Sequence, residues 1–312
     1  MVPGLTDPCL GTAVPGCPAE RSSARGFSRL GHNANVPFTI AHGAAVLPFR
    51  RWGFVTSALL VGSFAPDFEY FLRLAPGGKF GHTLAGTFVL TLPLALLTLW
   101  LFHRFIKLPL VGLLPGGVQR RLSGHVREFR FGGTPRFALI VSSILLGIAT
   151  HLAWDSFTHP RGWFYDHWPT LQRWFQVPLL GPTPLYKLLQ HISTMLGLFI
   201  LLFWLILLYR DTKPSPGPIQ NALPPAPKIM IVTLIALVAI AGGIVRAVLG
   251  SGVLIGHALN RQFVGMFVVT AIAVLCWELL AYGIFSAIKT SRRDHVRVSA
   301  KKFARPGDPG GT

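Results

Sequence analysis

The sequence is poor in charge, and above all in acidic residues. Of its 312 residues only 13% are charged and just 11 are Asp or Glu, whereas 51% are hydrophobic. Soluble domains carry about 25% charged residues, so this composition indicates that the lipid bilayer is part of the protein's solvent. The net charge of +18 does not predict a nucleic-acid partner, because the basic residues lie between and after apolar stretches, as they do in membrane proteins.

Cysteine is also scarce. Cys9 and Cys17 lie in a segment rich in Pro and Gly, and Cys276 lies inside an apolar stretch. No C-x-x-C pair occurs, so neither a zinc ribbon nor a disulfide framework is predicted, and a disulfide between Cys9 and Cys17 is left open.

The beginning of the chain lacks apolar periodicity. Residues 1–36 are rich in Gly, Pro, Ser and Arg and have no apolar region of the kind found in signal peptides. We expect them to form a disordered head. An alternative interpretation is that translation starts at Val36 and that the head is not made.

Long apolar stretches fill most of the remaining chain. They cover residues 38–49, 54–72, 84–106, 137–155, 184–209, 229–250 and 263–288. The last five approach or exceed the roughly 20 residues that span a bilayer. The first is too short to span, and Pro66 interrupts the second. The sequence therefore predicts an all-α, polytopic integral membrane bundle with about six or seven membrane-embedded helices.

The stretches also suggest a division of the chain. We expect a helical membrane core over 37–210, which would carry a metal site, and a Pro-rich linker over 211–228. A two-helix transmembrane appendage over 229–288 and a basic tail over 289–312 would follow.

Basic residues predict the orientation in the membrane. Lys and Arg are dense in 104–136 and after residue 288, and they are sparse in 156–183 and 251–262. By the positive-inside rule, the dense segments face the cytoplasm. The sequence therefore predicts a protein of the bacterial inner (plasma) membrane with a cytoplasmic C-terminus.

Ionisable residues interrupt the apolar stretches near the predicted outer face. In H-L-A-W-D-S-F-T-H, His151, Asp155 and His159 are four residues apart, so on a helix they form one polar stripe, which Pro160 would end. On the predicted topology four further residues fall at the same depth: His42, Asp67, His82 and His191.

Imidazoles and carboxylates in an apolar enclosure are the ligands that a divalent ion such as Zn²⁺ prefers. The sequence therefore predicts a metal site at the outer face. Two alternatives remain open: a polar network that ties helices together without catalysis, and the ionisable relay of a transporter.

Several motifs resemble a known bacterial membrane family. The runs V-P-F-T-I-A-H-G-A-A-V-L-P-F, G-S-F-A-P-D-F-E-Y, G-H-T, H-L-A-W-D-S-F-T-H and P-L-Y-K-L-L-Q-H closely resemble the domain-of-unknown-function family 4184, over about residues 37–210. This resemblance implies residence in the membrane and implies no particular chemistry.

The order of the ionisable residues carries a looser resemblance. It is similar to membrane-bound metal-dependent hydrolases and to the zinc-dependent phospholipase C and P1 nuclease group. That pattern would assign a first ion to Asp67, His82, His151 and Asp155. It would assign a second ion to His159 and His191, and a third to His42 with Asp155 bridging. The group has a Glu four residues after its last His, where this chain has Met195, so the second site would lack a carboxylate.

These features together predict a metal-dependent hydrolase that acts on a phosphoester or related bond. Asp67 and Asp155 are the predicted catalytic residues, because a carboxylate can orient an attacking water. Four tryptophans would lie at the level of the lipid headgroups: Trp154, Trp163, Trp168 and Trp174. We therefore expect a lipid or a lipid-linked phosphate as the substrate.

Overall fold

The computed structural model describes residues 39–75, 77–122, 129–160, 162–178, 181–215, 223–251 and 261–303. Its helical stretches that are long and apolar enough to cross a membrane are Leu84–Leu113, Thr134–His167, Leu185–Asp211, Pro225–Gly250 and Gln262–Arg292. These are the stretches that the sequence predicts as spans. The protein is therefore an all-α polytopic membrane protein, as predicted.

The first two apolar stretches fold as short, broken helices and not as spans. The first forms η1 (Thr39–His42), α2 (Gly43–Val46) and η2 (Leu47–Trp52). The second forms α3 (Thr56–Phe64), η3 (Ala65–Asp67) and α4 (Phe68–Arg73). Pro66 lacks the N–H that would continue α3, and the chain tightens there into a 3₁₀ turn that ends at Asp67.

The first span is preceded by a 3₁₀ turn, η4 (Phe80–His82). The span itself comprises α5 (Leu84–Gly86), η5 (Thr87–Thr91), α6 (Leu92–Leu101), η6 (Phe102–Ile106) and α7 (Lys107–Leu113). The hydroxyl of Thr83 caps it by accepting from the Gly86 N–H at 2.9 Å. The span is followed by α8 (Gly116–Leu122).

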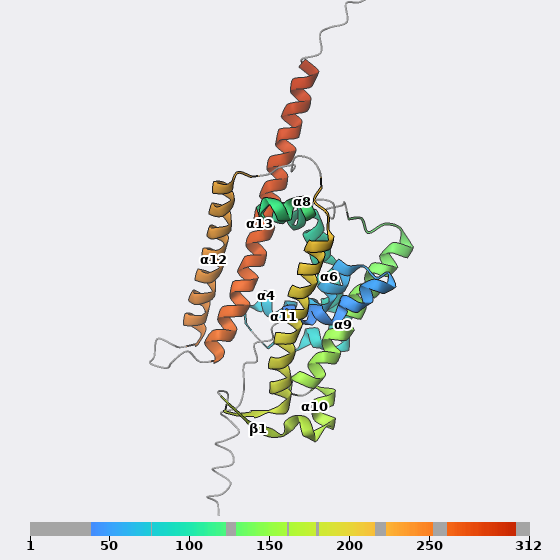
Figure 1. Ribbon diagram of the computed structural model, residues 1–312, viewed down its shortest axis with the longest axis vertical. Coiled ribbons are helices and arrows are strands. Elements are labelled where there is room, and N and C mark those ends of the chain that lie inside the picture. Colours follow the sequence, from blue (N-terminus) through green and yellow to red (C-terminus); the bar gives the residue numbers. More distant parts are fainter. Residues whose placement is uncertain are drawn as a thin grey trace, which may run out of the picture. The chain divides into compact units, whose positions relative to one another are not determined.

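The second span, α9 (Thr134–Thr158), carries the H-L-A-W-D motif and ends where the backbone of His159 becomes extended. Short elements follow: α10 (Trp163–His167), η8 (Pro169–Gln172) and the antiparallel pair β1 (Trp174–Val177) and β2 (Gly181–Pro184). This small hairpin is absent from the sequence-based prediction. It leads directly into α11 (Leu185–Asp211), which contacts α9 and β2 (Figure 1).

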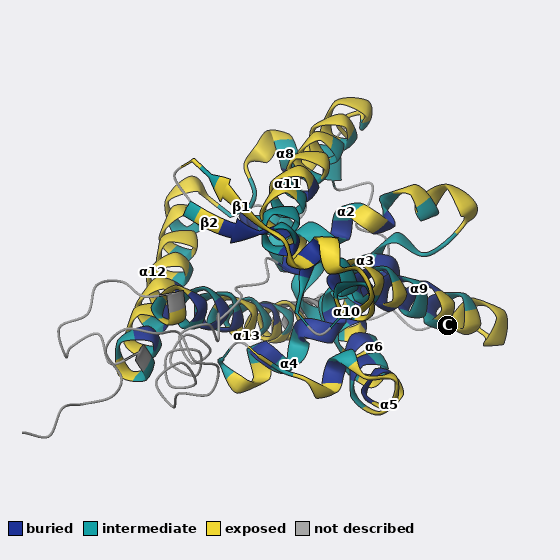
Figure 2. Cartoon of the chain, turned by 90° about the horizontal axis from the view of Figure 1, so that it is seen from below, coloured by how far each residue is buried: buried dark blue, intermediate teal, exposed yellow. Residues whose placement is uncertain are grey.

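The core lies where α3 crosses α9. Gly62 and Gly147 make the crossing close, because a Cβ at Gly62 would collide with the carbonyl oxygen of Ile144, and one at Gly147 with that of Leu59. The fully buried side chains around the crossing include Ala58, Ala95, Leu99, Ile140 and Ile144. Figure 2 shows buried residues on α3 and α9 and mostly exposed residues along α12.

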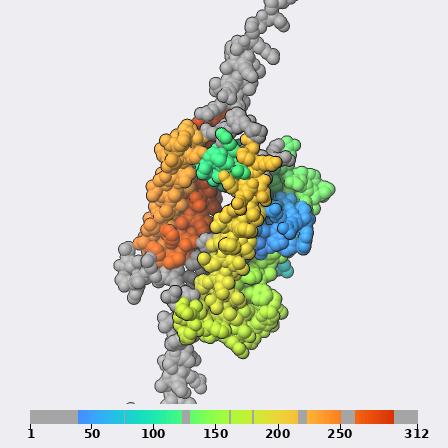
Figure 3. All heavy atoms as spheres, viewed as in Figure 1, coloured from blue at the N-terminus to red at the C-terminus, as the bar shows by residue number. Residues whose placement is uncertain are grey.

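The last two helices, α12 (Pro225–Ser251) and α13 (Arg261–Phe303), pack along each other. Figure 3 shows α11 and α12 on the face in view, with part of α13 between them. Helix α13 also contacts α4, η6 and α7, and Gly283 lies directly against the carbonyl oxygen of Phe105. It continues to Phe303, through much of the segment that the sequence predicts as a tail.

Candidate metal centre

Six of the seven predicted ligands are brought together around the crossing of α3 and α9. His42, Asp67 and His82 are each the last residue of a short 3₁₀ turn, at the ends of η1, η3 and η4. His151 and Asp155 lie one turn apart on α9, and His159 follows its last residue. The broken helices therefore bring isolated side chains to a single helix face.

The centre is buried. Asp67 and His151 are 0% exposed, and Asp155 is 9% exposed. Buried carboxylates are costly unless they are paired with a cation or a hydrogen-bond donor, so such a cluster requires a compensating charge.

Two imidazole nitrogens each lie at similar distances from two carboxylate oxygens, and Asp67, His82 and His151 offer ligand atoms close enough together to hold one ion. We call Asp67, His82, His151 and Asp155 the first group. Asp155 Oδ2 is 3.2 Å from His151 Nε2 and 3.5 Å from His82 Nε2. Asp67 Oδ1 is 3.4 Å from His82 Nε2 and 3.7 Å from His151 Nε2. In a tetrahedral zinc site with ligand distances of about 2.0–2.2 Å, neighbouring ligand atoms lie about 3.3–3.6 Å apart.

Most of these atoms have no hydrogen-bond partner. Asp67 Oδ1, His82 Nε2 and His151 Nε2 are all buried and unpartnered. Such orphaned atoms are rare in proteins, and an ion is one of the explanations for them. The donor set and its spacing fit a divalent ion.

Two hydrogen bonds orient this group from outside. His151 Nδ1 lies 2.8 Å from the carbonyl oxygen of Ser63, so Nδ1 donates and, in the neutral ring, Nε2 directs its lone pair toward the carboxylates. Thr39 Oγ1 donates to Asp67 Oδ2 at 2.6 Å, which leaves Oδ1 for an ion. Partners of this kind usually support metal ligands.

The other oxygen of Asp155 faces a second group, His42 and His159. Asp155 Oδ1 is 3.5 Å from His42 Nε2 and 3.2 Å from His159 Nδ1. The rings of His42 and His151 are stacked, with centroids 4.1 Å apart, and these two residues with Asp155 offer a further set of ligand atoms close enough for an ion. Asp155 would therefore offer one carboxylate oxygen to each group.

His191 lies outside this arrangement. Its side chain is exposed on α11, and so is that of Met195, at 68%. The adjacent Gln190 is buried, and its Nε2 lies 2.9 Å from His159 Nε2. The His159–His191 site implied by the looser resemblance stays a prediction.

The local electrostatics differ between the two groups. Burial, together with the nearby His151, lowers the pKa of His42 to about 4, so this ring is neutral at pH 7. Burial also disfavours a charge on His82, but the carboxylates of Asp155 and Asp67 outweigh it and raise its pKa to about 9. Without an ion, His82 is thus a cation between two carboxylates.

A small cavity of about 190 Å³ reaches the centre from the side of the second group. His42, His159 and Gln190 are among its lining residues. Trp154 and Leu196 make part of its wall apolar. The cavity gives a small polar group a route toward Asp155.

Sequence reasoning missed Thr39, Ser63 and Gln190. Thr39 belongs to the P-F-T-I-A-H run, but nothing in its spacing predicts contact with Asp67, which is far along the chain. Ser63 acts through its backbone carbonyl, which no residue type reveals. Gln190 directly precedes the predicted His191 and occupies the inward position instead.

Fold and site together define a polytopic helical membrane protein with a buried His/Asp cluster. The family model described as "Domain of unknown function (DUF4184)" matches residues 36–284, and the chain belongs to this family. The match extends beyond residue 210, the end expected from the sequence, and includes α12 and most of the apolar part of α13. No curated protein and no solved structure matches the chain.

Proposed function

We propose that this protein is a metal-dependent hydrolase that acts on a phosphoester or related bond of a membrane-associated substrate. The observation that carries the proposal is the first group, in which each imidazole Nε2 lies 3.2–3.7 Å from a carboxylate oxygen of Asp67 and of Asp155. Three of the four ligand atoms are buried without a hydrogen-bond partner. The mixture of imidazole nitrogens and carboxylate oxygens suits Zn²⁺.

A divalent ion held by the first group would polarise a phosphoryl or acyl oxygen and would make a water molecule nucleophilic near neutral pH. The chain supplies the base. Asp155 is the better of the two predicted catalytic residues, because its Oδ1 faces the second group, which lines the cavity, and has no hydrogen-bond donor. Asp67 already accepts a hydrogen bond from Thr39 and is fully buried, so it suits the role of a metal ligand better than that of a base.

The surroundings of the cavity favour a lipid or a lipid-linked phosphate as substrate. Trp154, Trp163, Trp168 and Trp174, all at this end of α9 and α11, are 44–68% exposed. Exposed tryptophans gather at the headgroup level of membranes, where a substrate with a polar head and an apolar tail would also lie.

The proposed location is the bacterial inner membrane, with the metal centre at the outer face and the C-terminus in the cytoplasm. Helix α11 supports this orientation. Near its first residue, Gln190 contacts His159 of the metal centre. Just beyond its last residue, Arg121 donates a hydrogen bond to the carbonyl oxygen of Thr212. Arginines thus lie at the end of α11 away from the metal centre, as the positive-inside rule requires.

The alternative is a non-enzymatic protein in which the cluster only ties helices together. The raised pKa of His82 favours this reading, since a protonated His82 pairs with both carboxylates without any ion. Metal content separates the two readings.

The test is elemental analysis of the full chain purified in detergent, beside Asp155→Ala and the control Asp166→Ala, which removes an exposed carboxylate of α10. We expect bound zinc in the wild type and in the control, and loss of it in Asp155→Ala. The wild type and the control should also hydrolyse chromogenic phosphomonoesters or phosphodiesters, and Asp155→Ala should not. Near-zero metal in all three proteins overturns the proposal. A wild type that is fully loaded with metal but hydrolyses no faster than Asp155→Ala overturns it too.

A further inference from the structure

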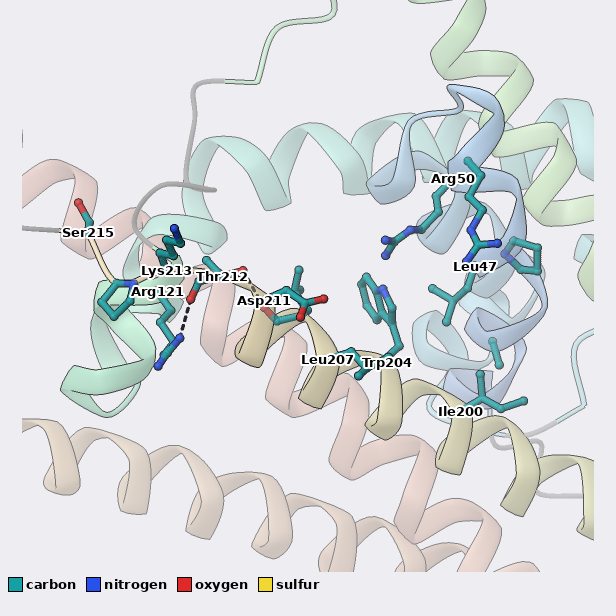
Figure 4. A pocket seen from close by; sticks show the side chains of 15 residues that line it. Leu47, Arg50, Arg121, Ile200, Trp204, Leu207, Asp211, Thr212, Lys213 and Ser215 are labelled. Atoms are coloured by element: carbon teal, nitrogen blue, oxygen red, sulfur yellow. Dashed lines mark hydrogen bonds between the residues drawn. The ribbon is translucent and has the colours of Figure 1, made fainter.

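A second, larger cavity of about 1460 Å³ lies toward the other end of α11. Side chains of η2, α8 and α11 line it, together with the residues that follow α11. Figure 4 shows Arg50 and Leu47 on one side, Trp204 and Leu207 on α11, and Arg121 near the end of that helix.

Positive charge dominates this cavity. Arg50, Arg51, Arg121 and Lys213 line it, and Asp211 is the single acidic residue among the lining residues. In the described part of the chain no carboxylate forms an ion pair with any of the three arginines. The excess of positive charge is therefore not neutralised by the described residues and is complementary to an anion.

Two of these arginines are already held in place. Arg121 donates to the carbonyl oxygens of Thr212, at 2.6 Å, and Tyr209, at 3.2 Å, and its guanidinium lies over the Tyr209 ring. Arg50 lies over the ring of Trp204, with 5.7 Å between the guanidinium carbon and the ring centroid. Planar guanidinium groups fixed in this way are well suited to phosphate oxygens.

The wall beside these charges is apolar. Leu47, Ile200 and Leu207 line the cavity, and the last two belong to a candidate membrane span. Trp204 adds an indole N–H that is buried without an acceptor, next to Arg50. A ligand that satisfies this lining needs an anionic, oxygen-rich head and an apolar body.

We infer that this cavity binds the phosphate headgroup of an anionic phospholipid. Basic pockets beside transmembrane helices on the cytoplasmic side bind such headgroups, and each Lys or Arg near the surface adds about 1 kcal/mol. A free phosphate would leave the apolar wall without a partner.

The lipid site is separate from the metal centre. Gln190, at the metal centre, and Trp204 are about 21 Å apart along α11, at about 1.5 Å per residue. A phosphate held by Arg50 and Arg51 is therefore too distant for hydrolysis at Asp155. The linings of the two cavities share Ala44 and Ile200, so the two cavities adjoin along α11.

The experiment measures lipid binding to the full chain by native mass spectrometry in detergent. Phosphatidylglycerol and phosphatidylcholine with the same acyl chains are compared, and glycerol 3-phosphate serves as a headgroup without a tail. We expect phosphatidylglycerol to bind at least about tenfold more tightly than phosphatidylcholine. The double variant Arg50→Gln/Arg51→Gln should lose about 25-fold of that affinity, since about 1 kcal/mol per arginine corresponds to about fivefold.

The matched control is Arg210→Gln, which removes an exposed arginine at the same end of α11 that is not among the lining residues. It should bind phosphatidylglycerol within about twofold of the wild type. The inference is overturned if the wild type binds both lipids with equal affinity. It is also overturned if the control loses as much affinity for phosphatidylglycerol as the double variant does. Full competition by glycerol 3-phosphate would also overturn it in favour of a soluble anion. Thermal unfolding in detergent, measured in parallel, checks that the variants are folded.

Discussion

His151 donates from Nδ1 to the carbonyl oxygen of Ser63 at 2.8 Å, and this bond joins α9 to α3 beside the metal centre. It exists because Gly62 and Gly147 let the two helix backbones approach. The helix crossing therefore sets both the position of His151 and the direction of its Nε2 lone pair.

The first prediction concerns the crossing. Gly147→Ala places a methyl group against the Leu59 carbonyl oxygen and 2.7 Å from the Ser63 backbone nitrogen, so α3 and α9 must separate. We expect a loss of about 1–3 kcal/mol in stability, the usual cost of overpacking, together with weaker zinc binding. Thermal unfolding in detergent measures the first effect and zinc titration the second.

The control for this prediction is Gly112→Ala on α7, where an added Cβ meets nothing within 4 Å. Alanine favours helix over glycine by about 1 kcal/mol, so this variant should be as stable as the wild type or more so. Equal melting temperatures for both variants would contradict the proposed close packing.

The second prediction concerns Thr39. Thr39→Val keeps the shape of the side chain and removes the hydroxyl that donates to Asp67 Oδ2. Loss of such an outer partner typically weakens metal binding by about 10–100-fold. Competition with a chromophoric zinc chelator measures the affinity. Thr290→Val, at an exposed site on α13, should leave it unchanged, and an equal effect in both variants would remove Thr39 from the centre.

The sequence predicted the five spans because long apolar stretches fold as helices in lipid whatever their partners are. It also identified His151 and Asp155 as neighbours, because helix periodicity alone brings them together. The interruption at Pro66 was visible too. Its consequence, a 3₁₀ turn that buries Asp67 completely, depends on the packing of α3 against α9.

Other parts of the site depend on tertiary contacts that no local pattern encodes. His191 has the residue type of a ligand, yet the turn of α11 exposes it and buries Gln190. The sequence pattern did not predict the short hairpin before α11, because β2, G-P-T-P, contains two prolines and has only one residue that favours strands, Thr183. Thr39 contacts Asp67 through its hydroxyl, and Ser63 contacts His151 through its backbone carbonyl. Neither contact follows from a local sequence pattern.

The third prediction separates the two groups of ligands. His82 belongs only to the first group and His42 only to the second. We expect His82→Ala to lose the ion of the first group and His42→Ala to keep it. Zinc content of the purified variants measures this, with His167→Ala, an exposed position on α10, as the control. If His42→Ala lost its zinc and His82→Ala kept it, the main metal site would be the second group and not the first.

The last prediction concerns metal removal. An ion that binds only the folded protein stabilises it by mass action, by about 4 kcal/mol at a concentration of 1,000 times Kd. Stripping it leaves the carboxylate of Asp67 and the ring of His151 fully buried, with His82 as the cation that faces the carboxylates of Asp67 and Asp155. We expect a strong chelator to lower the melting temperature of the wild type by several degrees, and excess zinc to restore it.

Asp155→Asn makes this last experiment decisive. The amide keeps the size of the side chain but removes the charge that faces His82, His151 and His159. If an ion holds the centre together, the variant starts near the melting temperature of the stripped wild type and chelation changes it little. If the cluster is a network of ion pairs alone, the chelator leaves the wild type unchanged while Asp155→Asn still destabilises it. The response of the wild type to the chelator therefore decides between a metal centre and a polar tie between helices.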